Sequence, residues 1–152
     1  MSERSDFDAE LVARPKRTTR WCWAGAAVVL TVCVFTATTL RGATEGGGTF
    51  TASDQFAMAG IGVLGAAAIL VFTRPRVWAG PKGVKVRNLV TSFELPWQVV
   101  VSVQYPKGAS WVMLELADDD LVAVMAIQAV DKEYAVEAAR RLRALLAESK
   151  SA

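Results

Sequence analysis

The chain has 152 residues, of which 53% are hydrophobic and 21% charged, and its formal net charge is +2 at pH 7. It contains no histidine, the residue that most often serves as a general base and as a metal ligand in proteins. The small net charge argues against nucleic-acid binding, which needs a strongly basic surface. The high apolar content makes the placement of the hydrophobic residues the first question.

Residues 1–20 are polar and predict a mobile tail. Acidic residues come first in it, and a group of basic residues follows directly before the first apolar segment. We call this group the basic collar; it consists of Arg14, Lys16, Arg17 and Arg20.

Two segments without a charged residue follow, at 21–40 and 55–73. As a helix, the first would span about 30 Å, the thickness of the hydrocarbon core of a bilayer. Trp21 and Trp23 stand at one end of it, where aromatic residues anchor membrane helices at the interface. These segments predict a membrane hairpin of two transmembrane helices.

Two other interpretations of the segments stay open. The first segment lies where a secretory signal peptide would lie, but it is longer than the roughly 7–15 apolar residues of such signals, and no clear cleavage site follows. The pair is also compatible with a buried helical hairpin of a soluble protein, although the Gly and Ala content of the second segment is typical of membrane helices.

The distribution of Lys and Arg predicts the orientation. Residues 41–54 are polar and Gly-rich, predict a flexible extracytoplasmic loop, and contain one basic residue, Arg41. Four basic residues lie in the collar, and five lie between Arg74 and Arg87. Because the side richer in Lys and Arg stays in the cytoplasm, we expect a multi-pass protein of the inner (cell) membrane with both termini cytoplasmic.

Each apolar segment has a face of small residues, which predicts that the two helices pack on each other. Small residues let helix backbones approach closely in lipid. The same faces are also suited to receive a helix of another protein. The residues are Cys22, Ala26, Cys33 and Ala37 in the first segment and Gly62, Gly65 and Ala66 in the second.

Residues 74–152 have the pattern of a small cytoplasmic domain. Short segments rich in Val and aromatic residues, separated by Gly, Pro and Asp, predict six strands between about residues 77 and 127. In one of them, Val84 and Val86 are expected to face the core and Lys85 and Arg87 the solvent, because strand side chains alternate. An amphipathic helix is predicted over about 131–148, with Asp131 as its N-cap.

This order of elements resembles a bacterial pleckstrin-homology (PH) domain. The resemblance is carried by the Gly80–Gly83 turn, the run VKVRN at 84–88 and Leu95-Pro96-Trp97. Two membrane segments followed by such a domain also resemble the actinobacterial membrane proteins grouped with low-molecular-weight protein antigen 6. The resemblance implies a membrane α-helical hairpin followed by a small α+β or all-β PH-like barrel with a C-terminal helix. A PH barrel has seven strands, one more than the pattern reveals.

Several residues are candidates for binding. Basic residues near an anionic bilayer each contribute about 1 kcal/mol, so a basic face predicts contact with lipid or phosphate groups; the alternative is that the same charges only set the topology. The candidates are Arg74, Arg76, Lys82, Lys85 and Arg87. Trp111 is a candidate contact for a partner protein. The run Asp118–Asp120 is interpreted as a solvated turn rather than a metal site, because three consecutive side chains diverge.

Nothing in the sequence predicts catalysis or a cofactor. Both cysteines lie in an apolar segment, Ser102 and Ser110 have no evident base, and the Gly80–Gly83 turn lacks the spacing of a phosphate-binding loop. PH folds serve as binding modules, so the resemblance implies a non-enzymatic adaptor or accessory subunit of a membrane protein complex, or self-association. The expected partners are protein and membrane lipid, without nucleic acid or a small-molecule substrate. The alternative is an anionic-lipid-contact module using Arg76, Lys85 and Arg87.

Overall fold

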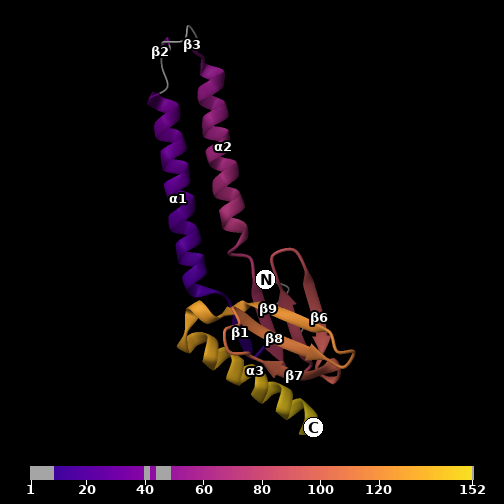
Figure 1. Ribbon diagram of the computed structural model, residues 1–152. Helices are drawn as coiled ribbons and strands as arrows, with labels where there is room; N and C mark the ends of the chain where they lie inside the picture. The colour runs from indigo at the N-terminus through magenta and orange to yellow at the C-terminus, as the bar shows by residue number, and fades with distance from the viewer. Residues whose placement is uncertain (1–8, 40–41, 44–48, 152) are drawn as a thin grey trace. The chain divides into compact units, whose positions relative to one another are not determined.

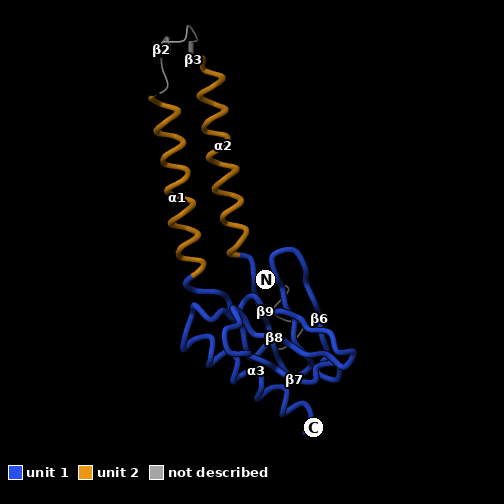
Figure 2. Tube along the Cα trace, in the orientation of Figure 1, with its two compact units in different colours: residues 1–17, 74–152 blue, residues 18–73 orange. Residues whose placement is uncertain are grey.

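A computed structural model describes residues 9–39, 42–43 and 49–151. The chain divides into two compact units, coloured separately in Figure 2. Unit 1 joins Met1–Arg17 to Arg74–Ala152, and unit 2 is Thr18–Thr73. Unit 1 is therefore built from both ends of the chain, and unit 2 from the segment between them.

The described residues of unit 1 form seven strands and one long helix (Figure 1). The strands are β1 (Leu11–Ala13), β4 (Arg76–Gly80), β5 (Gly83–Arg87), β6 (Ser92–Pro96), β7 (Val100–Gln104), β8 (Trp111–Leu116) and β9 (Leu121–Gln128), and the helix is α3 (Glu133–Ser151). Two short 3-10 helices, η2 (Trp97–Val99) and η3 (Ala129–Asp131), complete it. One antiparallel sheet has the order β1-β4-β5-β6 and the other β7-β8-β9. The predicted PH-like strands and C-terminal helix are present, but the two sheets do not close into the predicted barrel, because no strand-to-strand hydrogen bonds connect them within the described residues.

The core of unit 1 lies between the sheets and α3. Val84 and Val86 are fully buried, while Lys85 and Arg87 lie on the other face of β5, as the alternation predicts. Trp97 is buried, and its Nε1–H donates a 2.7 Å hydrogen bond to the carbonyl oxygen of Gly80, which ties η2 to the end of β4. Helix α3 buries the apolar face expected from its spacing, namely Ala135, Ala138, Ala139, Leu142, Leu145 and Leu146.

The structure differs from the predicted mobile tail. Residues Leu11–Ala13 form β1, which pairs antiparallel with β4, and Ala13 is fully buried opposite Val77. This is the seventh strand of the fold. The sequence pattern missed it because it is only three residues long and its partner lies beyond both long helices. Residues 1–8 of the predicted tail lie outside the described residues.

Unit 2 is a pair of long helices, α1 (Lys16–Thr39, whose first residues belong to unit 1) and α2 (Ala52–Val71). The short strands β2 (Gly42–Ala43) and β3 (Thr49–Phe50) pair between them. Of the flexible loop predicted at 41–54, residues 41 and 44–48 lie outside the described residues, and residues 52–54 instead form the beginning of α2. Both helices are long and apolar enough to cross a membrane, and only 11% of the 18-residue apolar stretch in each helix is buried. The core helices of a soluble protein would be mostly buried, so the structure does not favour that interpretation.

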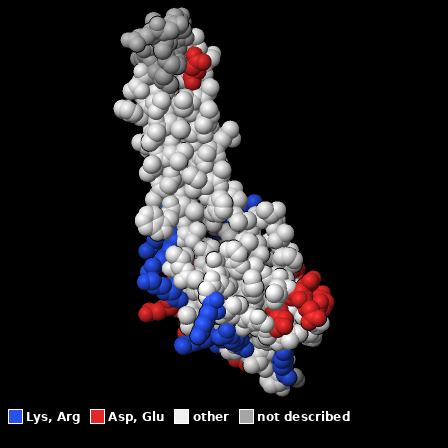
Figure 3. Space-filling model, in the orientation of Figure 1, with Lys and Arg blue, Asp and Glu red and all other residues white. Residues whose placement is uncertain are grey.

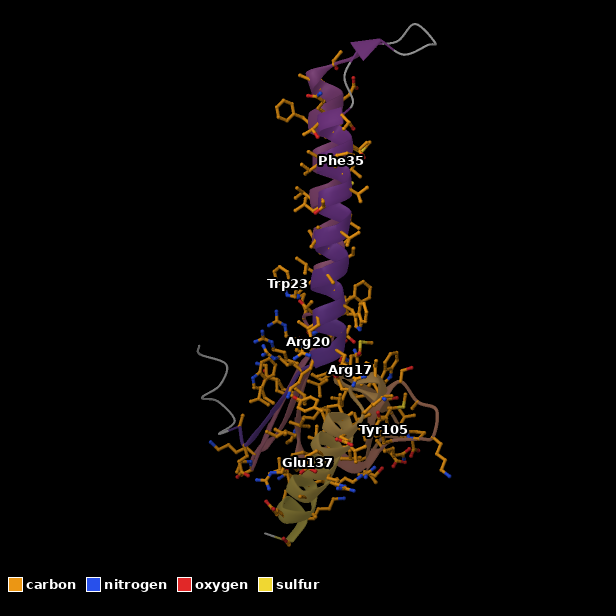
Figure 4. The ribbon with its side chains drawn as sticks, turned by 90° about the vertical axis from the view of Figure 1, so that its left-hand side faces the viewer. Arg17, Arg20, Trp23, Phe35, Tyr105 and Glu137 are labelled. Carbon is orange, nitrogen blue, oxygen red and sulfur yellow. The ribbon has the colours of Figure 1, made fainter. Side chains whose placement is uncertain are left out.

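Exposed aromatic side chains lie toward the ends of the two helices. Trp21 and Trp23 are 75% and 61% exposed near the start of α1, and Phe56 is 78% exposed near the start of α2. Trp23 and Phe35 point away from α1 (Figure 4). The visible face of the helices is free of charge along most of its length (Figure 3). This arrangement is typical of helices that face lipid and are anchored at its interfaces.

The carboxylate of Asp131 holds the beginning of α1, which corrects its predicted role as N-cap of α3. Lys132 has a positive φ of 51°, so the chain turns between Asp131 and α3. The carboxylate instead accepts hydrogen bonds from the backbone N–H groups of Lys16 (3.1 Å) and Arg17 (2.8 Å). The Lys16 ammonium also lies 3.9 Å from the ring centre of Tyr134. Side chains around the start of α3 therefore bind the first turn of α1.

Replacing Asp131 tests this cap. Asp131→Ala is expected to destabilise the full chain by about 1–3 kcal/mol, because two charge-assisted hydrogen bonds and a favourable interaction with the helix dipole are lost. Asp131→Asn, which keeps an acceptor, is expected to lose less. Thermal unfolding in mild detergent measures both, with Asp118→Ala in an exposed turn as the control. Equal melting temperatures for Asp131→Ala and Asp118→Ala would contradict the cap.

Candidate functional site

The predicted basic face does not form one cluster. Arg76 and Arg87 are cross-strand partners of β4 and β5, and Arg74 is exposed just before β4. Lys82 lies in the turn at the opposite end of this hairpin, about 13 Å away along the strands. The structure therefore brings three arginines together where the chain leaves α2 and enters β4, and separates Lys82 from them.

Lys85 lies between these two ends and has a partner within the sheet. Its Nζ is 2.7 Å from the Glu94 carboxylate, and its side chain is only 16% exposed. The two residues face each other across β5 and β6. The charge of Lys85 is therefore balanced by a neighbouring strand. Of the three arginines brought together, Arg74 and Arg76 are exposed and Arg87 is half-buried, so the first two are the better placed for contact with an anionic surface.

The small residues predicted to pack in the helical hairpin lie largely where α1 meets α2. Ala26, Ala37, Gly62 and Ala66 are buried, and Cys22 and Cys33 are half-buried. A Cβ atom added to Gly62 would lie 2.5 Å from the Cβ of Cys33. A Cβ on Gly65 would lie 3.3 Å from a methyl group of Val29. The absence of side chains at these two glycines allows the helices to approach closely.

Ser102 and Glu115 form a polar clamp across β7 and β8. The Ser102 hydroxyl donates a 2.6 Å hydrogen bond to the Glu115 carboxylate, and the Gln104 side chain donates another of 2.8 Å to the same oxygen. These bonds, the one from Ser102 first, lower the pKa of Glu115. Glu115 is thus held as an ionised acceptor that links the strands, rather than as a base poised to activate the serine.

A groove of about 560 Å³ runs between the end of β7 and helix α3. Tyr105 and Glu137, both labelled in Figure 4, belong to its lining. Burial raises the pKa of Tyr105, and the negative charge of Asp131 raises it further, so the phenol keeps its proton as a donor. The groove also contains Lys132 and Arg140 as well as Glu133, so its charges do not select a ligand of one sign.

Trp111, the candidate partner contact, is half-buried at the start of β8. It lines a smaller groove of about 200 Å³ with Ser110, Gln128 and Val130. The structure thus places Trp111 beside a mainly apolar surface where β8 begins and β9 ends.

Sequence reasoning missed Asn88. It is buried, and its side-chain amide donates a 2.8 Å hydrogen bond to the carbonyl oxygen of Ala123, while its carbonyl oxygen accepts one of 3.1 Å from Met125 N–H. The Asn88 side chain, directly after β5, therefore hydrogen bonds to the backbone of β9 and joins the two sheets. The only signal in the sequence was the run VKVRN, in which a polar residue follows an alternating strand.

Comparison with known proteins agrees with this architecture. A family model described as a bacterial PH domain matches residues 74–145. Uncharacterised proteins of Mycobacterium tuberculosis (strains H37Rv and CDC 1551) and Mycobacterium bovis are each 40% identical over 140 residues, covering 92% of this chain and 90% of theirs. No solved structure matches the chain.

Close packing of α1 on α2 predicts a difference between two glycines of the same helix. Gly62→Ile is expected to separate the helices and lower the thermal stability of the full chain in detergent, because its Cβ would overlap Cys33. Gly60→Ile introduces the same side chain where nothing lies within 4 Å, and is expected to change little. Equal melting temperatures for the two variants would show that the helices do not pack through this face.

Proposed function

The chain belongs to the bacterial PH domain family together with its mycobacterial relatives, and on that premise we propose that it is a non-enzymatic binding module anchored in the cell membrane. It acts as an adaptor or accessory subunit of a membrane protein complex. PH-like folds generally bind rather than catalyse, and the arrangement of the membrane segments supports a role in presenting such a surface.

One observation carries this proposal: the apolar helices are inserted between two paired strands of the domain. Strand β1 precedes α1 and strand β4 follows α2, yet the two strands pair in one sheet. Pro15 and Pro75, one near each junction, are both fully buried. A domain whose sheet is connected at two neighbouring strands to the membrane segments is attached at two points of the chain, which suits presenting a surface to a neighbouring membrane protein.

The same pairing supports the proposed topology. Residues that pair in β1 and β4 must lie on one side of the membrane, which requires an even number of crossings between them. Two crossings by α1 and α2 meet this requirement. The collar and the stretch from Arg74 to Arg87 contain nine Lys and Arg residues, against one in the connecting loop. This bias supports a cytoplasmic domain with both termini in the cytoplasm.

Crosslinking in the native membrane tests the adaptor role. The full chain is crosslinked in its own membrane, purified in mild detergent and analysed by mass spectrometry. We expect a membrane protein at near-stoichiometric amount, crosslinked to unit 1 or to the helical hairpin, and absent from a control purification of an unrelated two-span protein of similar abundance. Recovery of self-crosslinks alone would overturn the adaptor role.

A second function, contact with anionic lipid, is favoured by the position of Arg74 and Arg76. Both are exposed, and both follow α2 directly in the sequence. A chain that leaves a membrane helix after Val71 has little length in which to move these residues away from the bilayer surface. Their charges would then meet lipid phosphate groups whether or not a protein partner is bound.

Lipid retention tests this second function. The variant Arg74→Gln/Arg76→Gln is expected to retain fewer anionic phospholipids on mild purification, because each arginine contributes about 1 kcal/mol near an anionic surface. Neutral lipid is expected to stay unchanged, as is the crosslinked protein partner. Lys107→Gln/Arg140→Gln removes two other exposed charges of unit 1 and serves as the control. Equal anionic lipid in all three proteins would contradict the lipid contact.

A further inference from the structure

The two sheets of unit 1 have four edges, formed by β1, β6, β7 and β9. An exposed sheet edge offers backbone N–H and C=O groups that pair readily with another chain, and proteins usually cover it. The way in which each edge is treated therefore indicates where the domain accepts a partner.

Helix α3 covers the edge at β7. The Arg143 side chain donates a 3.0 Å hydrogen bond to the carbonyl oxygen of Val103, and the Lys150 ammonium donates one of 2.9 Å to that of Val101. These two side chains occupy acceptors that an added strand would need. The β7 edge is therefore closed by the chain itself.

The edges at β9 and β1 are also covered. The Asn88 amide pairs with the backbone of β9 at Ala123 and Met125. Strand β1 is only three residues long and packs beside α3, where the Tyr134 hydroxyl lies 3.4 Å from the backbone nitrogen of Arg14. A short edge strand beside a helix leaves little backbone for another chain.

The edge at β6 is different. Strand β6 pairs with β5 on one side, and among residues 9–39, 42–43 and 49–151 no group hydrogen bonds to its other side. Four of its five residues are exposed, Leu95 being the exception. The strand ends in Pro96, a residue that sheets tolerate at their edges. Within the part of the chain that the structure describes, this is the edge that is left open.

An apolar groove with an acidic rim continues from this edge. The groove has a volume of about 470 Å³ and is lined by Leu95, Val99, Leu116, Ala117 and Asp118. Asp118 begins the exposed turn Asp118–Asp120 between β8 and β9. Acidic side chains gather at the margin of unit 1 in Figure 3. The surface thus combines free backbone groups, an apolar cavity and negative charge.

We propose that the β6 edge binds an extended basic segment of a partner protein by adding it as a further strand to the sheet. Main-chain hydrogen bonds to β6 supply affinity, and alternate side chains supply specificity. An apolar side chain of the segment enters the groove beside Leu95 and Val99, and a Lys or Arg faces Asp118 and Asp120. This inference rests on the proposed function as a binding module and identifies its binding surface.

Charge decides against a second copy of the chain as the occupant. Two β6 strands pairing edge to edge would bring Glu94 of each copy and both acidic turns close together, and like charges facing each other are unfavourable. A basic segment instead gains from the same charges. An anionic bilayer is also disfavoured at this surface, because the acidic side chains repel its negative charge.

Peptide selection on the full chain tests the proposal. The protein is placed in nanodiscs of zwitterionic phosphatidylcholine, which do not attract basic peptides by charge, and short random displayed peptides are selected against it. We expect the selected peptides to alternate apolar residues with Lys or Arg. N-methylation of the amides along one edge of such a peptide is expected to abolish binding, because those amides pair with β6. Recovery of no peptide, or of peptides indifferent to N-methylation, would overturn the proposal.

Two variants of the protein locate the binding. Asp118→Lys/Asp120→Lys and Val99→Gln are each expected to weaken binding of the selected peptides at least about tenfold, the first through repulsion and the second by filling the apolar groove with a polar, uncharged side chain. The charge reversal removes the 3.4 Å hydrogen bond that the Asp118 carboxylate accepts from Asp120 N–H, but the backbone hydrogen bonds between Leu116 and both Asp119 and Asp120 remain to hold the turn. Val136→Gln changes a comparably exposed valine in the groove between β7 and α3, and is expected to have no effect. Equal loss in Val136→Gln and Val99→Gln would contradict the assignment to β6.

A photocrosslinker at Ser92 of β6, compared with one at Arg140 of α3, separates this proposal from the proposed function. A native membrane partner captured from Arg140 but not from Ser92 would keep the adaptor role and overturn the β6 site. Capture of a second copy of the chain from Ser92 would assign the edge to self-association and overturn it as well. Capture of no protein from either position would overturn both.

Discussion

The pairing of β1 with β4 is the constraint on which the other features of this protein depend. It joins residues separated by both long helices, so in the proposed membrane topology it requires both chain segments to lie on the same side of the membrane. The buried Ala13 and Val77 that meet across this pair make it part of the core. In the proposed topology, folding of the domain is therefore linked to insertion of the hairpin, since β1 and β4 pair only when both helices have crossed.

This arrangement also explains the position of Asp131. A helix that begins inside a folded domain has backbone N–H groups that need acceptors, and the local sequence Arg14-Pro15 supplies no side-chain cap. The carboxylate of Asp131 accepts hydrogen bonds from two of these groups, at Lys16 and Arg17, and the Lys16 ammonium lies over the Tyr134 ring. The first turn of α1 is thus stabilised by residues from the other end of the domain.

The features that the sequence predicts well are those with local causes. The alternation of Val84, Lys85, Val86 and Arg87 fixes which side of β5 faces the core, and helical spacing fixes the buried face of α3. The partners of Asp131, Asn88 and Lys85 come from other elements of the fold. The spacing of hydrophobic residues along a strand or helix therefore does not predict them. The same limit applies to β1, whose three residues become a strand only because β4 lies beside them. The open edge at β6 is likewise recognisable only once the other edges are seen to be covered.

Anchoring changes what a five-residue edge can achieve as a binding site. A strand added to β6 gains few main-chain hydrogen bonds, and ordering an extended segment costs conformational entropy, so its intrinsic affinity is modest. If the partner is itself a membrane protein, both are confined to a thin layer, and the encounter takes place at a raised effective concentration. For the proposed adaptor, a weak and charge-selective edge is then sufficient, and its low intrinsic affinity disfavours pairing with unrelated strands that are not held in the same layer.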